Sequence, residues 1–177
     1  MLVITIPGIE LYDENTNEFV SSDPQKLRIE HSLLSISKWE AKWHKPFLSS
    51  DKNSEEILDY IKCMTINNVN DDVYYRLSTS NIKDINEYIE NPMTATTIND
   101  TKRGGSKEII TSELIYYWII SFNIPIECQR WHINRLLTLI KVCNIKNSPP
   151  EKTNKQELMN RNKRLNEERR KKLESNG

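Results

Sequence analysis

Residues 111–143 read TSELIYYWIISFNIPIECQRWHINRLLTLIKVC and form the most apolar run of the chain. Large apolar side chains recur there every three or four positions, which is the period of an α-helix. The pattern predicts two helices, over 111–122 and 125–143, joined at Asn123-Ile124 as an αα-hairpin. Pro125 suits a first helical turn because its missing N–H needs no partner there. Apolar groups on nearly every side place both predicted helices at the centre of the core.

The first thirty residues alternate between apolar and polar side chains, as strands with one buried face do. Turn-forming residues separate the short runs at Pro7-Gly8 and again at 13–17. The spacing predicts a small antiparallel β meander over residues 1–30. A sheet of this size needs a cover on its apolar face, and the helical segments that follow are suited to provide it.

Helical periodicity also marks the middle of the chain. The predicted helices cover 32–45, where Trp39 and Trp43 share one stripe, 54–64 with Ser54 as N-cap, 71–77, and 81–91 with Asn81 as N-cap. Residues 93–108 break the period. Gly104-Gly105 beside Lys102 and Arg103 predicts an exposed loop or hairpin in that segment.

A chain of 177 residues is about the length of one domain. The predicted fold class is α+β and mainly α, with a small N-terminal antiparallel β meander packed on a helical bundle that has a central αα-hairpin. The globular domain is expected over 1–147, with the meander in 1–30 and the helical part in 31–147. Asn147-Ser148-Pro149-Pro150 predicts a stiff linker, so that 148–177 forms a separate charged tail, helical or disordered.

The charges are balanced overall but unevenly distributed. The chain holds 25 Lys/Arg and 25 Asp/Glu, so no protein-wide field steers it toward nucleic acid or a membrane. Residues 151–177 carry nine Lys/Arg and five Glu, a net charge of +4, which leaves −4 for residues 1–150. The tail has few large apolar groups and no aromatic residue. It is therefore expected to be solvated, extended or waiting for a partner.

A protein partner is the favoured interpretation of this tail, and nucleic acid is an unlikely partner, because glutamates are interleaved with the basic residues and nothing can stack on bases. Leu158 and Leu165 are predicted anchors for docking of a helix into a groove. The candidate partner-binding residues also include the basic run Arg169, Arg170, Lys171 and Lys172.

Trp43 is a further candidate partner-binding residue. Together with Trp39 and Phe47 it places three large aromatic side chains within nine positions, and aromatic residues are favoured as interface anchors. Burial within the fold is the simpler interpretation, since apolar residues on one stripe usually face the core. An exposed Trp43 would favour the interface.

No set of residues predicts catalysis or a cofactor. Cys128 and His132 stand four apart on a predicted helix and could both face a metal, but no close pair of cysteines completes a zinc site. The three cysteines are predicted to be reduced and structural. Lys102–Lys107 lacks the spacing of a P-loop. The protein is therefore predicted not to be an enzyme and to hold no metal or cofactor, and no segment predicts a membrane span or a signal peptide.

Several segments resemble a family of small proteins from tailed phages and prophages. They are Glu30–Glu40 with Trp43, Lys45–Leu48, Asp59–Met64, Pro92–Thr96 and the long run Ile109–Pro150. The family is similar to the tail assembly chaperones of long-tailed phages, which are encoded beside the tape measure protein. Nearly the whole chain is covered by this resemblance.

The resemblance implies a non-enzymatic assembly factor in the cytoplasm of a bacterial host. Such a chaperone would bind the tape measure protein and help to recruit the tail tube protein around it, with a homo-oligomer as a possible state. The family supplies no catalytic residues. Two alternatives stay open, namely a structural virion component (a head-tail connector or a minor tail protein) and a nucleic-acid-binding regulator.

Overall fold

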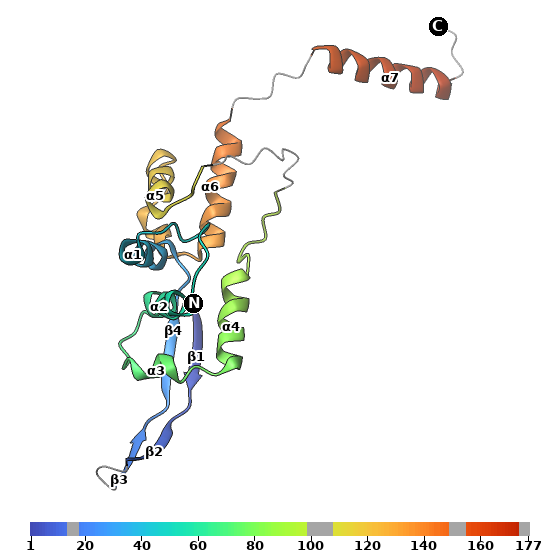
Figure 1. Cartoon of the computed structure of the whole chain (residues 1–177). Coiled ribbons are helices and arrows are strands. Elements are labelled where there is room, and N and C mark those ends of the chain that lie inside the picture. The colour runs from blue at the N-terminus through green and yellow to red at the C-terminus, as the bar shows by residue number, and fades with distance from the viewer. Residues whose placement is uncertain (14–17, 99–107, 149–154, 174–177) are drawn as a thin grey trace. The chain divides into compact units, whose positions relative to one another are not determined.

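The computed structural model describes residues 1–13, 18–98, 108–148 and 155–173. The fold is α+β and mainly helical, as predicted, with antiparallel strands at the N-terminus (Figure 1). Two compact units divide the chain, Met1–Cys143 and Asn144–Gly177. The described elements are β1 (Leu2–Ile6), β2 (Ile9–Asp13), β3 (Glu18–Ser22), β4 (Gln25–Ile29), α1 (Leu33–Trp43), α2 (Ser54–Met64), α3 (Asp72–Tyr75), α4 (Thr79–Glu90), α5 (Ser112–Ser121), the 3-10 helix η1 (Ile126–Arg130), α6 (Ile133–Asn147) and α7 (Lys155–Leu173).

The strands form a two-stranded ribbon and not the predicted meander. β1 pairs with β4 and β2 pairs with β3, both antiparallel, so the two pairs are successive halves of one hairpin. Figure 1 shows β2 and β3 continuing the ribbon beyond β1 and β4. The predicted turn at 13–17 lies, from residue 14 onward, outside the described residues.

Pro7-Gly8 interrupts the ribbon without reversing the chain, which corrects the predicted turn there. The ladder stops at Ile6 opposite Gln25 and resumes at Ile9 opposite Ser22. Asp23-Pro24 occupies the same level on the other arm. Each proline lacks the N–H that a ladder bond needs, and both therefore interrupt the pairing at one place.

One face of the β1–β4 pair is buried, because buried and less buried residues alternate along both strands. Its side chains, exposed by 5% or less, are Ile4, Ile6, Leu27 and Ile29. α4 packs against β1. The chain at the end of α2 lies along the edge of β4 that does not pair with β1. There the Glu30 N–H donates to the Met64 carbonyl oxygen at 2.9 Å. Covering this face supplies the burial that a small ribbon lacks alone.

α1 packs against α2, α5 and η1 and takes a central place in the helical part. Ser32 caps its N-terminus, and His44 ends it in the left-handed region at φ 53°. Trp39 is fully buried, and its indole N–H donates to the Glu56 carbonyl oxygen at 2.9 Å. The predicted stripe of this helix therefore forms core.

The second helix of the predicted αα-hairpin begins at Ile133 and not at Pro125. Residues 126–130 form the 3-10 helix η1, and Trp131 is extended with ψ 158°. The reason is a contact with a distant part of the chain: His132 forms a β-bridge with Ser32, and the Ile133 N–H donates to the His31 carbonyl at 2.9 Å. These bonds hold the chain extended where the apolar period alone favours a helix.

Two further helix starts differ from the sequence prediction by one to three residues. Asn53, not Ser54, caps α2, and Ser78, not Asn81, caps α4. In both helices the third helical residue bonds back to the cap, which satisfies two of the N–H groups left free at a helix start. Asn81 is that third residue in α4. The predicted helix at 71–77 is shortened to α3.

Candidate functional site

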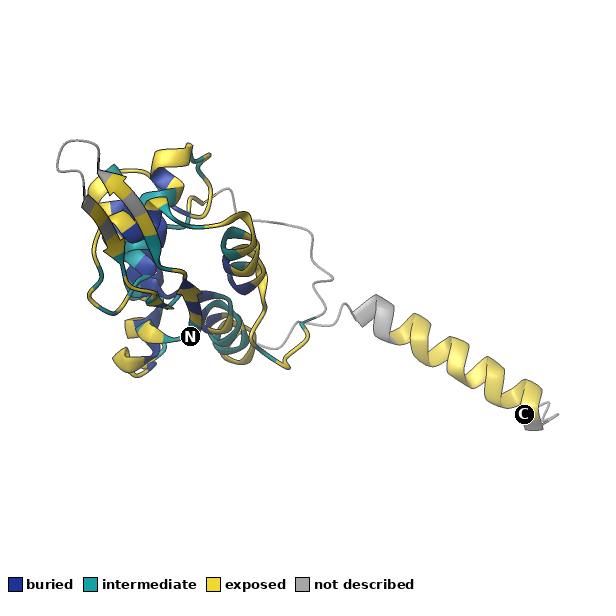
Figure 2. Ribbon diagram, turned by 90° about the horizontal axis from the view of Figure 1, so that it is seen from below, coloured by how far each residue is buried: buried dark blue, intermediate teal, exposed yellow. Residues whose placement is uncertain are grey.

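The predicted partner-binding residues of the tail all fall in α7. Every described side chain from Met159 to Lys172 is exposed, as the yellow ribbon of Figure 2 shows. Leu165 is 39% exposed and Met159 is 64% exposed. The side chain of Leu158 and the linker residues Pro149-Pro150 lie outside what the structure describes.

α7 is strongly basic over its described side chains. Residues 159–172 hold seven Lys/Arg and two Glu, a net charge of +5. The Arg164 Nε lies 3.8 Å from the Glu168 carboxylate, one turn along the helix. The basic run ends in the last turn with Arg170, Lys171 and Lys172, where cations interact favourably with the helix dipole. The segment has charge available for an acidic partner.

Trp43 lies in the other compact unit and is half-buried. Its indole N–H donates to the Asp59 carboxylate at 2.9 Å, and its ring centroid lies 6.3 Å from that of Trp39. Lys42 also pairs with Asp59. The Trp43 side chain thus joins α1 to α2, which is a packing role.

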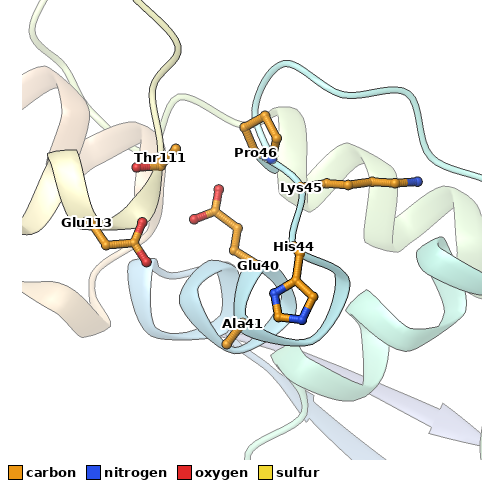
Figure 3. Close-up of a pocket in the computed structure, with 7 residues that line it drawn as sticks. All are labelled: Glu40, Ala41, His44, Lys45, Pro46, Thr111 and Glu113. Atoms are coloured by element: carbon orange, nitrogen blue, oxygen red, sulfur yellow. The ribbon is translucent and has the colours of Figure 1, made fainter.

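A pocket of about 350 Å³ opens between the end of α1 and the start of α5 (Figure 3). Its lining residues are Glu40, Ala41, His44, Lys45, Pro46, Thr111 and Glu113. The buried Glu40 carboxylate accepts the Phe47 N–H and the Ser112 N–H, each at 2.7 Å. Glu40 therefore ties the loop after α1 to the first turn of α5.

The remaining charged groups of this pocket are also engaged in the fold. In Figure 3 the Lys45 side chain points away from the pocket, and it pairs with the buried Glu56. Hydrogen bonds from its own N–H and from Thr111 lower the pKa of Glu113 at the α5 N-terminus. The arrangement stabilises the junction between α1, the loop after it and α5.

A second polar cluster surrounds His31, which is buried. Its Nδ1 lies 2.6 Å from the Tyr60 hydroxyl, and its ring centroid lies 5.0 Å from that of His132. His132 Nε2 lies 2.9 Å from the Tyr88 carbonyl oxygen; a carbonyl only accepts, so Nε2 carries the proton. His132 Nδ1 is buried and has no hydrogen-bond partner among the residues that the structure describes.

Burial lowers the pKa of both histidines. The pKa of His31 falls to about 3, first through desolvation and then through His132. The pKa of His132 is lowered by desolvation and, more weakly, by the N-terminal amine. Two cations at this spacing in a buried place would be costly, so both rings are neutral at pH 7.

The predicted pair Cys128 and His132 does not share a helix, which corrects that expectation. Cys128 is buried in η1, and His132 lies beyond its end. Over the described residues, no group of three or more His, Cys, Asp or Glu is placed to hold a metal ion. Cys63, Cys128 and Cys143 are free thiols. The Lys102–Lys107 segment falls outside the described residues.

The stacking of Arg135 on Trp131 is not predicted from the sequence. The Arg135 guanidinium carbon lies 4.1 Å from the centroid of the Trp131 ring. The spacing of four residues between an aromatic residue and an arginine was the available signal. The apolar period of residues 125–143 predicts a continuous helix there and does not predict this stack.

No family model, no curated protein and no solved structure matches this chain. Of the helices in the described part of the chain, none has both the length and the apolar content that crossing a membrane requires.

Proposed function

We propose that this protein is a tail assembly chaperone of a long-tailed phage, which binds the tape measure protein and assists assembly of the tail tube. The observation that carries the proposal is α7, an exposed basic helix in a compact unit separate from the remainder of the fold. The resemblance of several segments to such chaperones supports it further, namely Glu30–Glu40 with Trp43, Lys45–Leu48, Asp59–Met64, Pro92–Thr96 and Ile109–Pro150. The proposed site of action is the bacterial cytoplasm.

In this proposal α7 is the capture segment. Most of the stability of a helix in a protein comes from the packing of an apolar face, which the exposed α7 lacks, and a partner that orders it must offset the entropy lost. The exposed Met159 and Leu165 provide a small apolar contact, while Arg169 to Lys172 provide charge attraction. A contact of this kind is reversible, as an assembly factor that leaves the finished tail requires.

The test is co-expression of the full chain with the tape measure protein of the same phage, measuring how much of that protein stays soluble. The variant R169E/R170E/K171E/K172E reverses the basic run. We expect it to lower the soluble tape measure protein at least fivefold, because four favourable charges become repulsive toward an acidic partner.

The matched control reverses four exposed cations of the first unit, Lys26, Lys38, Lys83 and Arg130, and therefore changes the net charge by the same amount. It should retain near-full capture. Equal solubility with wild type and the α7 variant would count against the proposal. So would recovery of the protein in stoichiometric amounts from purified virions, which would favour a structural virion component.

A further inference from the structure

A second surface, distinct from α7, is a groove beside α6. Its volume is about 350 Å³. Two threonines after α4 form one wall, and residues around α6 form the remainder. The lining residues are Thr94, Thr96, Trp131, Arg135, Thr138, Leu139 and Val142. All belong to the first compact unit.

The wall of the groove belongs to a segment without regular secondary structure, and the start of that segment is held by α6. The Asn134 side-chain amide donates to the carbonyl oxygens of Ile89 at 3.0 Å and Asn91 at 2.9 Å. Beyond that anchor, residues 92–98 form neither helix nor strand. Within the described part of the chain, the backbone groups of Ala95 and Thr97 have no hydrogen-bond partner.

The floor of the groove combines apolar groups with one fixed cation. Trp131, Leu139 and Val142 are half-buried. The guanidinium of Arg135 stacks on the Trp131 ring at 4.1 Å, which orients its N–H groups. No described carboxylate lies within ion-pair distance of Arg135. A permanently charged group thus lines the groove, and none of the carboxylates that the structure describes pairs with it.

The size and lining of the groove favour a short extended peptide over a helix or a nucleic acid. A volume of about 350 Å³ is at the small end of ligand pockets and does not accommodate a helix about 10 Å across. A single lining cation is too little for a nucleic acid, whose binding uses several phosphate contacts. Arg135 and Leu139 are about 6 Å apart along α6, close to the roughly 6.6 Å between alternate side chains of a strand.

We propose that this groove binds a short extended peptide in which an acidic side chain pairs with Arg135 and the residue two positions on packs on Leu139. Trp131 would hold the guanidinium in place, and Thr94 and Thr96 would line the side of the groove opposite α6. This site does not depend on the function proposed for α7.

The test uses the peptide acetyl-Thr-Asp-Thr-Ile-Thr-amide and the full chain labelled with ¹⁵N. The reporter is the indole N–H signal of Trp131, one of four tryptophans, assigned by its loss in W131F. We expect a saturable shift with a Kd of about 1 mM or tighter. The same peptide with Asn in place of Asp should bind at least tenfold more weakly.

Two arginine variants complete the test. R135Q should weaken binding at least tenfold, whereas R130Q removes an exposed arginine of η1 that does not line the groove and should leave the Kd within twofold. An equal loss of peptide affinity in R135Q and R130Q would overturn the proposal. So would the absence of any shift of the Trp131 signal at 5 mM peptide. A duplex of 12 base pairs that shifts the signal more strongly than the peptide, and loses that effect in R135Q, would assign the groove to nucleic acid instead.

Discussion

At the scale of the residue, the buried polar groups of this protein join distant elements. Glu40 accepts two backbone N–H groups, from Phe47 and from Ser112. His31 connects the start of α1 to Tyr60 of α2, and its carbonyl receives the N–H of Ile133. A buried group without a partner is costly, so these contacts constrain how the helices meet.

The histidine cluster makes stability depend on pH. Because the pKa of His31 is lowered to about 3 in the fold, the unfolded chain binds more protons between pH 6.5 and 3. Above pH 6.5 His31 is neutral in both states and does not lower the free energy of unfolding. As the pH falls from 6.5 to 3, protons bind the unfolded chain at His31 and stability is lost. We expect about 3 kcal/mol to be lost between pH 6.5 and 4 through this residue, measured by urea unfolding at several pH values.

The variant H31Q should flatten this pH dependence, since a glutamine keeps a polar contact to Tyr60 but does not titrate. His44 provides the control, because it is exposed and left-handed, a conformation that asparagine tolerates. H44N should keep the wild-type slope. If H31Q loses stability on acidification as steeply as wild type, the assignment to His31 is wrong.

At the scale of the element, Pro7-Gly8 predicts a turn from sequence but instead interrupts the strand pairing of the ribbon. Pro7 and Pro24 stand on opposite arms between the two ladder segments. The arms are close at Gly8, where an added Cβ would lie 2.4 Å from the Ser22 carbonyl oxygen. The glycine is required by this close approach of the backbone and not by a left-handed conformation.

Replacing Gly8 should therefore destabilise the protein. Alanine favours folding slightly through the entropy of the unfolded chain, but here its Cβ clashes with backbone that cannot move independently. We expect G8A to lower the free energy of unfolding by about 1–3 kcal/mol, measured by urea denaturation. The control T5A removes side-chain atoms at an exposed position of β1 and should cost clearly less. Equal costs in the two variants would refute the close-approach argument.

At the scale of the whole molecule, the division into two compact units and the division between the acidic and the basic part of the chain fall close together. The boundary between the compact units falls at Cys143–Asn144, within α6, and the basic excess begins just after that helix ends. The described side chains of α7 are exposed from Met159 to Lys172. The described side chains of the second unit are therefore exposed, while the first unit contains the buried core.

This division is testable by truncation. Removing residues 151–177 retains all of α6 and takes away no buried side chain that the structure describes. We expect the melting temperature to change by less than about 2 °C, because about 1 kcal/mol corresponds to a few degrees in a domain of this size. Thermal unfolding followed by circular dichroism measures this. A drop of more than 5 °C would show that the tail stabilises the first unit.

The sequence by itself determined the features that depend on neighbours along the chain. Periodicity of three and four predicted α1, α2, α4 and α5, because a helix closes its hydrogen bonds over four residues. Alternation predicted strands in the first thirty residues. The charge excess predicted a separate tail. Trp39 was placed in the core by its stripe alone, and it is fully buried.

Tertiary structure decided what depends on residues far apart. Ladder bonds between β1 and β4 join positions about twenty or more residues distant, so local turn signals did not specify the pairing. α6 begins at Ile133 because His31, about one hundred residues earlier, accepts its N–H. The groove at Arg135 exists only because the segment after α4 lies beside α6. Such contacts reflect the free energy of the folded chain as a whole, which no short window of sequence contains.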